Sequence, residues 1–100
     1  MNKYSINKLP GDVRLELALK HKNLRKQKGL SQIELAERSG VSLGSLKRFE
    51  TKGLVSLESL LKLVFVLGRL SDFERVLEPD KDLKHIQRLF DSKKKANGTH

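Results

Sequence analysis

The side chains best suited to contact a charged partner are concentrated within residues 42–48. This segment carries serine hydroxyls, an ammonium group and a guanidinium group, which all donate hydrogen bonds to anions. When the segment is read as a helix, Leu46 points inward and the other positions are left on the outside. These outward positions are Ser42, Leu43, Gly44, Ser45, Lys47 and Arg48. Their chemistry favours binding to an anion.

No other set of residues has the spacing of a catalytic or metal site. His21 falls on the inner face of a predicted helix, where a histidine is more often structural. His85 and His100 have no sequence neighbours that would complete a metal site, and cysteine is absent. Asp80 with Asp82 is typical of a helix start, where negative charge complements the helix dipole. We therefore expect no enzyme activity, no cofactor and no bound metal.

The charge of the chain indicates a polyanionic partner. Its 100 residues contain 21 Lys and Arg against 12 Asp and Glu, a formal net charge of +9. The excess of basic residues lies in residues 1–55 and in the last nine residues, whereas residues 56–91 are slightly acidic. No apolar run reaches the ~18 residues of a membrane span, and the N-terminus does not resemble a signal peptide. We expect a cytoplasmic protein.

Helix-starting and helix-ending residues divide the chain into six predicted helices. Ser31 with Glu34, and Ser71 with Glu74, form the S-x-x-E pattern of a capping box. The other predicted caps are Asp12, Ser42, Ser56 and Asp80, and the glycines expected to end helices are Gly29, Gly40, Gly53 and Gly68. Many Leu, Lys and Glu residues favour helices over strands, so the predicted fold is all-α.

Apolar residues at helical spacing predict which helix faces are buried. The face of the first helix holds Val13, Leu17, His21, Leu24 and Lys28. The second and third helices bury Leu35, Ala36, Val41, Leu46 and Phe49, and Ala36 is small enough to let them cross closely. The fourth and fifth bury Leu57, Leu60, Leu61, Val64, Leu67, Phe73, Val76 and Leu77.

The segment from Gln32 to Thr51, QIELAERSGVSLGSLKRFET, contains two short predicted helices joined by a three-residue turn. Its small residues, its turn glycine and its apolar positions all agree with two helices that cross at close range. The segment resembles the helix-turn-helix of the Xre (Cro/CI-type) family of DNA-binding regulators, and residues 24–67 look like the whole family domain. The resemblance implies a compact lambda-repressor-like domain of five to six helices.

The resemblance also implies that the second helix of the motif enters the major groove of DNA while the first lies across the backbone. Arg48 is then the best candidate to read a guanine, whose two acceptors match its forked donors, with a phosphate contact as the alternative. Lys47 is expected at a phosphate because an ammonium group is a weak geometric reader. Gln32, Lys52 and the amide groups at Ser56 are implied to contact phosphates.

Two further expectations come from the same resemblance. Arg25 is implied to form an ion pair with Glu50. Leu43 and Gly44 depart from the pattern, since many relatives carry Gln or Asn at the start of the reading helix. Leu43 contacts a thymine methyl group or no base, and Gly44 permits close approach of the backbone or makes no contact.

The chain divides into four predicted regions. They are an N-terminal arm (1–11), a DNA-binding domain (12–78), a C-terminal helix (79–91) and a disordered basic tail (92–100). The C-terminal helix carries an apolar stripe beyond what a five-helix domain needs, formed by Leu83, Ile86, Leu89 and Phe90. This stripe either folds back on its own domain or packs against a second copy or another protein.

The leading hypothesis is a homodimeric, sequence-specific regulator that binds a palindromic double-stranded DNA operator and represses its own operon. The alternative is a protein-interaction module that resembles the HipB-type antitoxins, which bind a kinase-like toxin, with DNA binding secondary. A weaker third hypothesis is nonspecific packaging of nucleic acid by the basic half.

Overall fold

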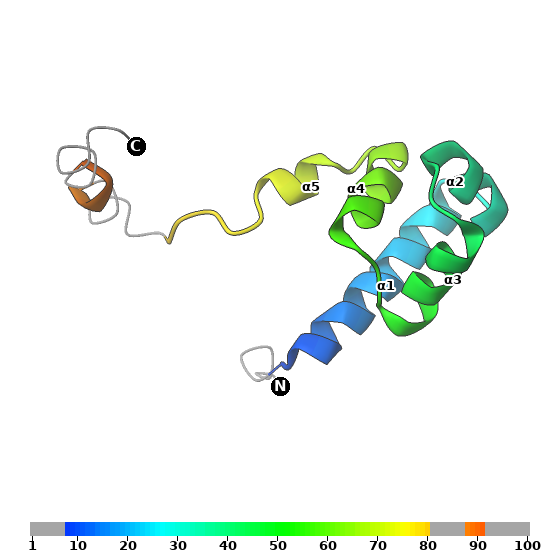
Figure 1. The fold of residues 1–100 in the computed structure, drawn as a ribbon, viewed down its shortest axis with the longest axis horizontal. Coiled ribbons are helices and arrows are strands. Elements are labelled where there is room, and N and C mark those ends of the chain that lie inside the picture. Colours follow the sequence, from blue (N-terminus) through cyan, green and yellow to red (C-terminus); the bar gives the residue numbers. More distant parts are fainter. Residues whose placement is uncertain (1–7, 81–87, 92–100) are drawn as a thin grey trace.

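The computed structural model describes residues 8–80 and 88–91, and all regular structure in these two ranges is helical. The helices are α1 (Pro10–Gln27), α2 (Gln32–Ser39), α3 (Leu43–Lys52), α4 (Leu57–Val66) and α5 (Ser71–Glu74) (Figure 1). A further helical turn covers residues 88–91. The prediction of an all-α fold is therefore confirmed. No helix in the described ranges is both long enough and apolar enough to cross a membrane.

The helices α1 to α4 form one packed body. The long helix α1 packs against α3, and α2 packs against both α3 and α4 (Figure 1). The first turns of α1 extend beyond the end of α3, and the segment after α5 leads away from the packed helices (Figure 1). Helix α3 is thus held in place by contacts with both α1 and α2.

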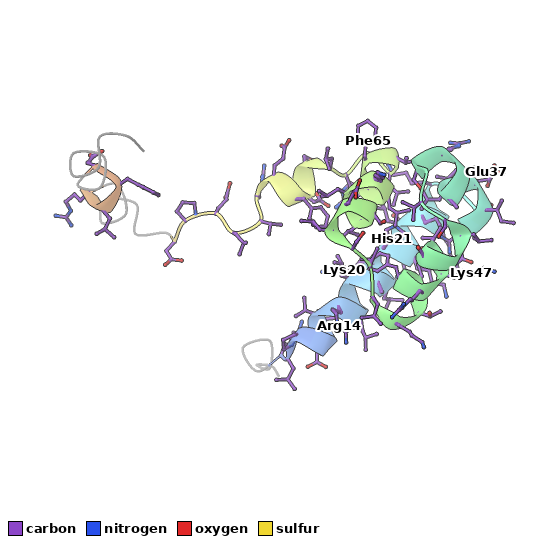
Figure 2. All side chains as sticks on the ribbon, viewed as in Figure 1. Arg14, Lys20, His21, Glu37, Lys47 and Phe65 are labelled. Atoms are coloured by element: carbon purple, nitrogen blue, oxygen red, sulfur yellow. The ribbon has the colours of Figure 1, made fainter. Side chains whose placement is uncertain are left out.

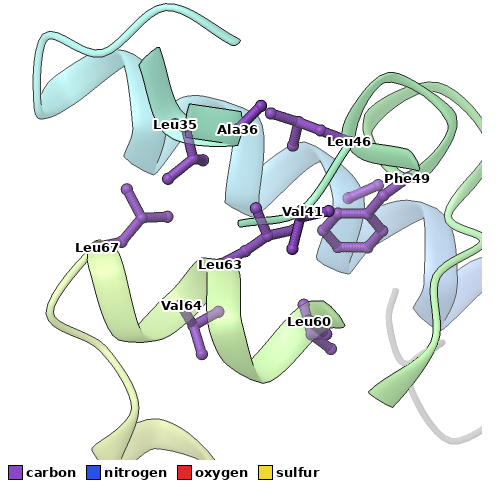
Figure 3. Close-up of a cluster of buried hydrophobic side chains, with 10 residues drawn as sticks. Leu35, Ala36, Val41, Leu46, Phe49, Leu60, Leu63, Val64 and Leu67 are labelled. Atoms are coloured by element: carbon purple, nitrogen blue, oxygen red, sulfur yellow. The ribbon is translucent and has the colours of Figure 1, made fainter. Parts of the chain in front are cut away.

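The core lies where these four helices meet, and Figure 3 shows its side chains in close-up. Its buried apolar members are Ala18, Leu35, Ala36, Val41, Leu46, Phe49, Leu60, Leu63, Val64 and Leu67. Burial of the predicted residues of α2, of the turn and of α3 is confirmed, including the small Ala36. Ala18 and Leu63 also belong to the core, although the periodicity argument omitted them.

Three predicted inward positions of the first and fourth helices are wrong. Leu57 is 67% exposed because the core contacts of α4 begin one turn later, and Val55 from the preceding loop packs against that end of the core. Val13, in the first turn of α1, is 51% exposed. Lys28 is exposed after the end of α1.

The predicted starts of α2, α3 and α4 are confirmed. Ser31 and Glu34 form the reciprocal hydrogen bonds of a capping box, 3.0 and 2.8 Å long. Ser42 and Ser56 each accept a hydrogen bond from the backbone N–H three residues later, at 3.1 Å. These caps satisfy backbone donors that have no partner inside the helix.

The predicted cap of the first helix, Asp12, is wrong by three residues, because Leu9 occupies the cap position. Helix α1 begins at Pro10, whose fixed backbone angle and missing N–H suit the first position of a helix. Asp12 still stabilises this end, because its carboxylate accepts a hydrogen bond of 2.9 Å from the backbone N–H of Leu9.

The fifth helix differs most from its prediction. Ser71 is the first residue of α5 and makes no cap bond, so the second capping box is wrong. The helix has only four residues, and Leu77 has a backbone φ of 62°, which a right-handed helix does not allow. Val76 and Leu77 were expected in the core but are 55% and 96% exposed, whereas Phe73 packs against it half-buried.

Part of the predicted C-terminal stripe lies outside the described residues, namely Leu83 and Ile86. Leu89 and Phe90 lie in the helical turn at residues 88–91 and are 49% and 58% exposed. Residues 1–7 of the predicted arm and the predicted tail, 92–100, also lie outside the described residues.

Candidate nucleic-acid interface

Helix α3 presents a polar and basic face to solvent. Ser42, Gly44, Ser45, Lys47 and Arg48 are all exposed. Lys47 projects from α3 at the edge of the molecule in Figure 2. The buried side of the same helix holds Leu46 and Phe49 in the core, so α3 cannot rotate without exposing them. The outward side chains are therefore held on a fixed support.

Leu43 differs from its predicted outward position. Its side chain is half-buried and packs against the core, because an apolar side chain at the first position of α3 gains more from contact with the core than from water. Only part of this side chain is left to contact another molecule. Gly44, the next residue, is exposed, and no other atom lies within 4 Å of the position a β-carbon would take.

Two serines shape the first turn of α3. The Ser42 hydroxyl accepts a hydrogen bond of 3.1 Å from the backbone N–H of Ser45 and donates one of 2.9 Å to the Ser45 hydroxyl oxygen. The hydrogen of Ser42 is thus used within the helix, while the Ser45 hydroxyl keeps its own hydrogen as a donor. Of the two, Ser45 is the one equipped to donate to an acceptor on a bound molecule.

Several of the predicted contact residues line one hollow between α3 and the start of α4. The hollow has a volume of about 320 Å³, and its walls are formed by Ser45, Arg48, Leu54, Val55, Ser56 and Ser59. Arg48 contributes a positive charge from α3, and the first backbone N–H groups of α4 follow Ser56. Such N–H groups have no partner within their helix and attract anions. The hollow therefore places the guanidinium of Arg48 beside the first backbone N–H groups of α4.

A buried hydrogen-bond cluster fixes α3 to α1. The carboxylate of Glu50 accepts hydrogen bonds of 2.9 Å from Nε and Nη2 of Arg25, one at each oxygen. Nδ1 of His21 lies 2.9 Å from Oε2 of the same carboxylate. Arg25 also donates from Nη1 to the carbonyl oxygen of Leu30, at 2.9 Å, which secures the loop before α2. One carboxylate thus ties together α1 and α3.

The same cluster holds the side chain of Gln32, which the sequence places at a phosphate. Nε2 of Gln32 donates a hydrogen bond of 3.0 Å to Oε1 of Glu50. Because an ionised carboxylate only accepts hydrogen bonds, it fixes the nitrogen side of the amide toward itself. The second amide hydrogen and the amide oxygen of Gln32 are left for other partners, and the side chain is half-buried.

Glu50 is ionised in the folded chain. Burial raises its pKa, but the hydrogen bonds from His21, Arg25 and Gln32 and the charge of Arg25 more than offset this effect and lower the pKa to about 2. The negative charge of Glu50 is balanced by Arg25, so the cluster adds little negative charge beside a surface that is otherwise basic.

His21 has a structural position, as its sequence context indicates. Its Nδ1 donates to the ionised Glu50, which leaves Nε2 buried without a protein partner. The imidazole ring packs edge-on against Phe49, with ring centroids 4.9 Å apart. The spacing of four residues between His21 and Arg25 puts both on one side of α1, and this signal could have predicted their common partner.

The C-terminal end of α3 is held by α1. Gly53 ends the helix with a φ of 70°, and a β-carbon at this residue would lie 2.8 Å from the backbone oxygen of Arg14. The Arg14 side chain donates from Nη1 to the carbonyl oxygen of Lys52, at 3.4 Å, while the Lys52 side chain remains exposed. No pattern in the sequence predicts this contact of Arg14.

Comparison with known proteins assigns this arrangement to a family. The family model described as helix-turn-helix (HTH_3) matches residues 22–73, which include α2, the turn at Gly40, α3 and α4. No curated protein and no solved structure matches the chain significantly. Gly40, in the turn of the motif, has the left-handed conformation expected there, with a φ of 78°. The chain belongs to the Xre (Cro/CI-type) helix-turn-helix family of DNA-binding regulators and has its lambda-repressor-like all-α fold.

Proposed function

We propose that the protein is a sequence-specific repressor that binds a palindromic double-stranded DNA operator in its own promoter. The observation that carries this proposal is the placement of Arg48, exposed on α3 and lining the hollow that leads to the start of α4. An α-helix fits the major groove of DNA, and a guanidinium group can bond both guanine acceptors there. In this arrangement α3 is the reading helix and Arg48 its principal base contact.

The phosphate contacts of the proposal surround α3. Lys47 and Lys52 are exposed on α3, and the N–H groups after Ser56 begin α4. Gln32, oriented by Glu50, offers one amide hydrogen from the start of α2. Contacts of this kind position a protein on the duplex without reading its sequence. Affinity then comes mainly from the lysines, and specificity from Arg48 with a smaller share from Ser45.

A dimer suits this function because one reading helix covers only a few base pairs. Two copies related by a two-fold axis would read two half-sites centred about 34 Å apart. Leu89 and Phe90 are about half-exposed, which supports a role of the C-terminal stripe in association. The stripe, which also includes Leu83 and Ile86, is proposed as a surface for a second copy or for another protein.

The test of this proposal is the substitution Arg48→Ala in the full chain. Duplexes enriched by binding from a random pool supply the operator, and affinity is then measured at constant salt. We expect Arg48→Ala to weaken binding by about 1–3 kcal/mol and to relax the preference at one base position in each half-site. The matched control is Arg75→Ala, which removes an equally exposed guanidinium beyond the packed helices. Unchanged affinity and unchanged sequence preference in Arg48→Ala would contradict the assignment.

A further inference from the structure

Helix α4 carries a row of apolar side chains that its own domain does not bury. Leu57 and Phe65 are each 67% exposed, and Leu61 between them is half-buried. Residues four apart lie on one side of a helix, so these three form a continuous row, which we name the α4 ridge. Phe65 projects from α4 away from the α3 helix that carries Lys47 (Figure 2). The Phe65 end of the ridge is therefore separate from the exposed face of α3.

The ridge is not explained by the needs of the core. On the adjoining side of α4 the domain already buries Leu60, Leu63, Val64 and Leu67. Exposed apolar residues that stand alone need no explanation, but a row along one helix face is typical of an association surface. The ridge extends over two full turns, from the first residue of α4 to its end.

Charged residues border the ridge in an order that complements itself. Glu58 and Lys62 each follow a ridge residue by one position, so both lie on the same flank of α4. Their side chains are 80% and 51% exposed, and Nζ of Lys62 lies 3.4 Å from Oε2 of Glu58. The negative charge is near the N-terminal end of the ridge and the positive charge nearer its C-terminal end. When a second copy of α4 runs antiparallel to the first, the negative end of one ridge therefore lies beside the positive end of the other.

We propose that the α4 ridge docks against the α4 ridge of a second copy of this chain, with the two helices antiparallel. A two-fold axis at Leu61 places Leu57 of each copy against Phe65 of the other, because both residues are four positions from the axis. It also brings Glu58 of each copy within reach of Lys62 of the other. Each isologous contact of this kind occurs twice, and the surface closes with two copies.

This inference rests on the proposed function and gives the dimer a geometry. Helix α4 starts at the hollow that contains Arg48, so pairing through α4 joins the two reading helices by short, rigid connections. The spacing between the two half-sites is then fixed by packed helices and not by the chain after α5. Insertion of base pairs between half-sites is expected to cost affinity steeply.

The first test measures the mass of the full chain by sedimentation equilibrium over a range of concentrations. We expect a dimer whose dissociation constant rises at least about tenfold in Phe65→Glu, the loss typical of an aromatic anchor at an interface. The control is Leu19→Glu, which places the same charge at a 57% exposed leucine of α1 and is expected to leave the dimer intact. At a concentration where the wild type is monomeric, both variants should unfold at the wild-type temperature, since both positions are exposed in the single chain.

A charge-reversal experiment tests the antiparallel register. Glu58→Lys and Lys62→Glu each place like charges opposite one another across the two-fold axis and are expected to weaken the dimer. The double variant Glu58→Lys with Lys62→Glu restores unlike pairs and is expected to recover most of the wild-type affinity between copies. A double variant as weak as the single variants would overturn this register.

DNA measurements separate the failure of this inference from the failure of the proposed function. Phe65→Glu is expected to bind a duplex with one half-site with wild-type affinity. Unlike the wild type, it is expected to bind a duplex with two half-sites no more tightly than two independent sites. The inference is overturned if the wild type is a monomer at its highest soluble concentration, or if Phe65→Glu leaves the mass unchanged. It is also overturned if Phe65→Glu lowers the unfolding temperature at a concentration where the wild type is monomeric, because the ridge is then covered within one chain. Absence of any DNA binding by the wild type would refute the proposed function while the mass measurement still decides the dimer.

Discussion

Glu50 joins α3 to α1 and α2 through its side-chain hydrogen bonds. Its side chain is almost fully buried, and its carboxylate accepts hydrogen bonds from Arg25, His21 and Gln32. A buried charge is tolerated only when it is paired and hydrogen-bonded, and here both conditions are met. Loss of the carboxylate leaves Arg25 without its counter-ion and releases Gln32 from its fixed orientation.

We predict that Glu50→Gln lowers the free energy of unfolding at pH 7 by about 3–5 kcal/mol, the usual cost of removing one partner of a buried ion pair. The measurement is urea unfolding followed by circular dichroism. Glu37→Gln is the control, because Glu37 is an exposed glutamate on the neighbouring helix α2 (Figure 2). A Glu50→Gln variant as stable as Glu37→Gln would contradict the structural role of the cluster.

The acid sensitivity of the fold follows from the same residue. The pKa of Glu50 is lowered from 4.5 to about 2 in the folded chain, so its ionised form is stabilised by folding. This stabilisation is fully present above pH 4.5 and is lost progressively as the pH falls toward 2, because the unfolded chain then binds a proton that the folded chain resists. We predict that wild-type stability falls more steeply than that of Glu50→Gln over this range, as measured by unfolding at several pH values. Parallel curves would contradict the lowered pKa.

The partners of Glu50 could be predicted only in part. The pair with Arg25 was expected from the family resemblance. His21 and Gln32 lie 29 and 18 residues away in the sequence and approach the carboxylate only when α1, α2 and α3 have packed. A local sequence pattern does not predict contacts between residues so far apart in the chain. The only local signal is the spacing of four residues that puts His21 and Arg25 on one side of α1.

At the scale of the element, the two ends of α3 are fixed by different interactions. Ser42 starts the helix with a local hydrogen bond, whereas Gly53 ends it against the backbone of α1. The turn of the motif at Gly40 has a similar left-handed backbone, but no atom lies within 4 Å of the position of its absent β-carbon. A substitution at Gly40 thus tests the cost of backbone strain alone, whereas one at Gly53 tests backbone strain together with close packing.

We predict that Gly53→Ala destabilises the fold by more than Gly40→Ala. Both variants carry the cost of a left-handed non-glycine residue, about 1–2 kcal/mol. Gly53→Ala in addition forces its β-carbon to within 2.8 Å of the backbone oxygen of Arg14, so α1 and α3 must move apart. Urea unfolding of the two variants measures the difference. Equal losses would show that α1 does not press against the end of α3.

Elements whose ends depend on local bonds could be predicted, and elements that depend on packing could not. The serine caps of α2, α3 and α4 need only residues within one turn, and these caps are confirmed. The fifth helix had a similar pattern at Ser71, but it stops after four residues because the following segment leaves the core. Leu57 fits the apolar period of α4 as well as Leu60 does, yet Leu57 is exposed and Leu60 is buried, while Val55 packs against the core ahead of them.

At the scale of the whole molecule, the two proposed surfaces serve different partners. The exposed basic residues of α3 form one surface, and the α4 ridge forms another, bordered by Glu58 and Lys62. The net charge of +9 predicted a polyanionic partner but not which residues face it. The ridge could not be predicted either, because its members have the same period as the core residues of α4.

Salt dependence tests the basic surface as a unit. We predict that the logarithm of DNA affinity falls linearly with the logarithm of salt concentration, with a slope of about −0.9 for each phosphate neutralised. Lys52→Gln should reduce the magnitude of this slope by about 1 for each protomer bound. Lys20→Gln, on the side of α1 away from Lys47 in Figure 2, is the control and should leave the slope unchanged. Equal slopes for both variants would remove Lys52 from the interface.

The central claim is that α3 reads a base sequence, and one comparison tests it most directly. Affinities are measured at a single salt concentration for a duplex enriched from a random pool and for random duplexes of equal length. Specific binding by a reading helix predicts an affinity ratio of at least about 10³, which falls when Arg48 is replaced by alanine. Equal affinities for the two kinds of duplex would contradict the claim and would leave nonspecific binding by the basic surface as the function.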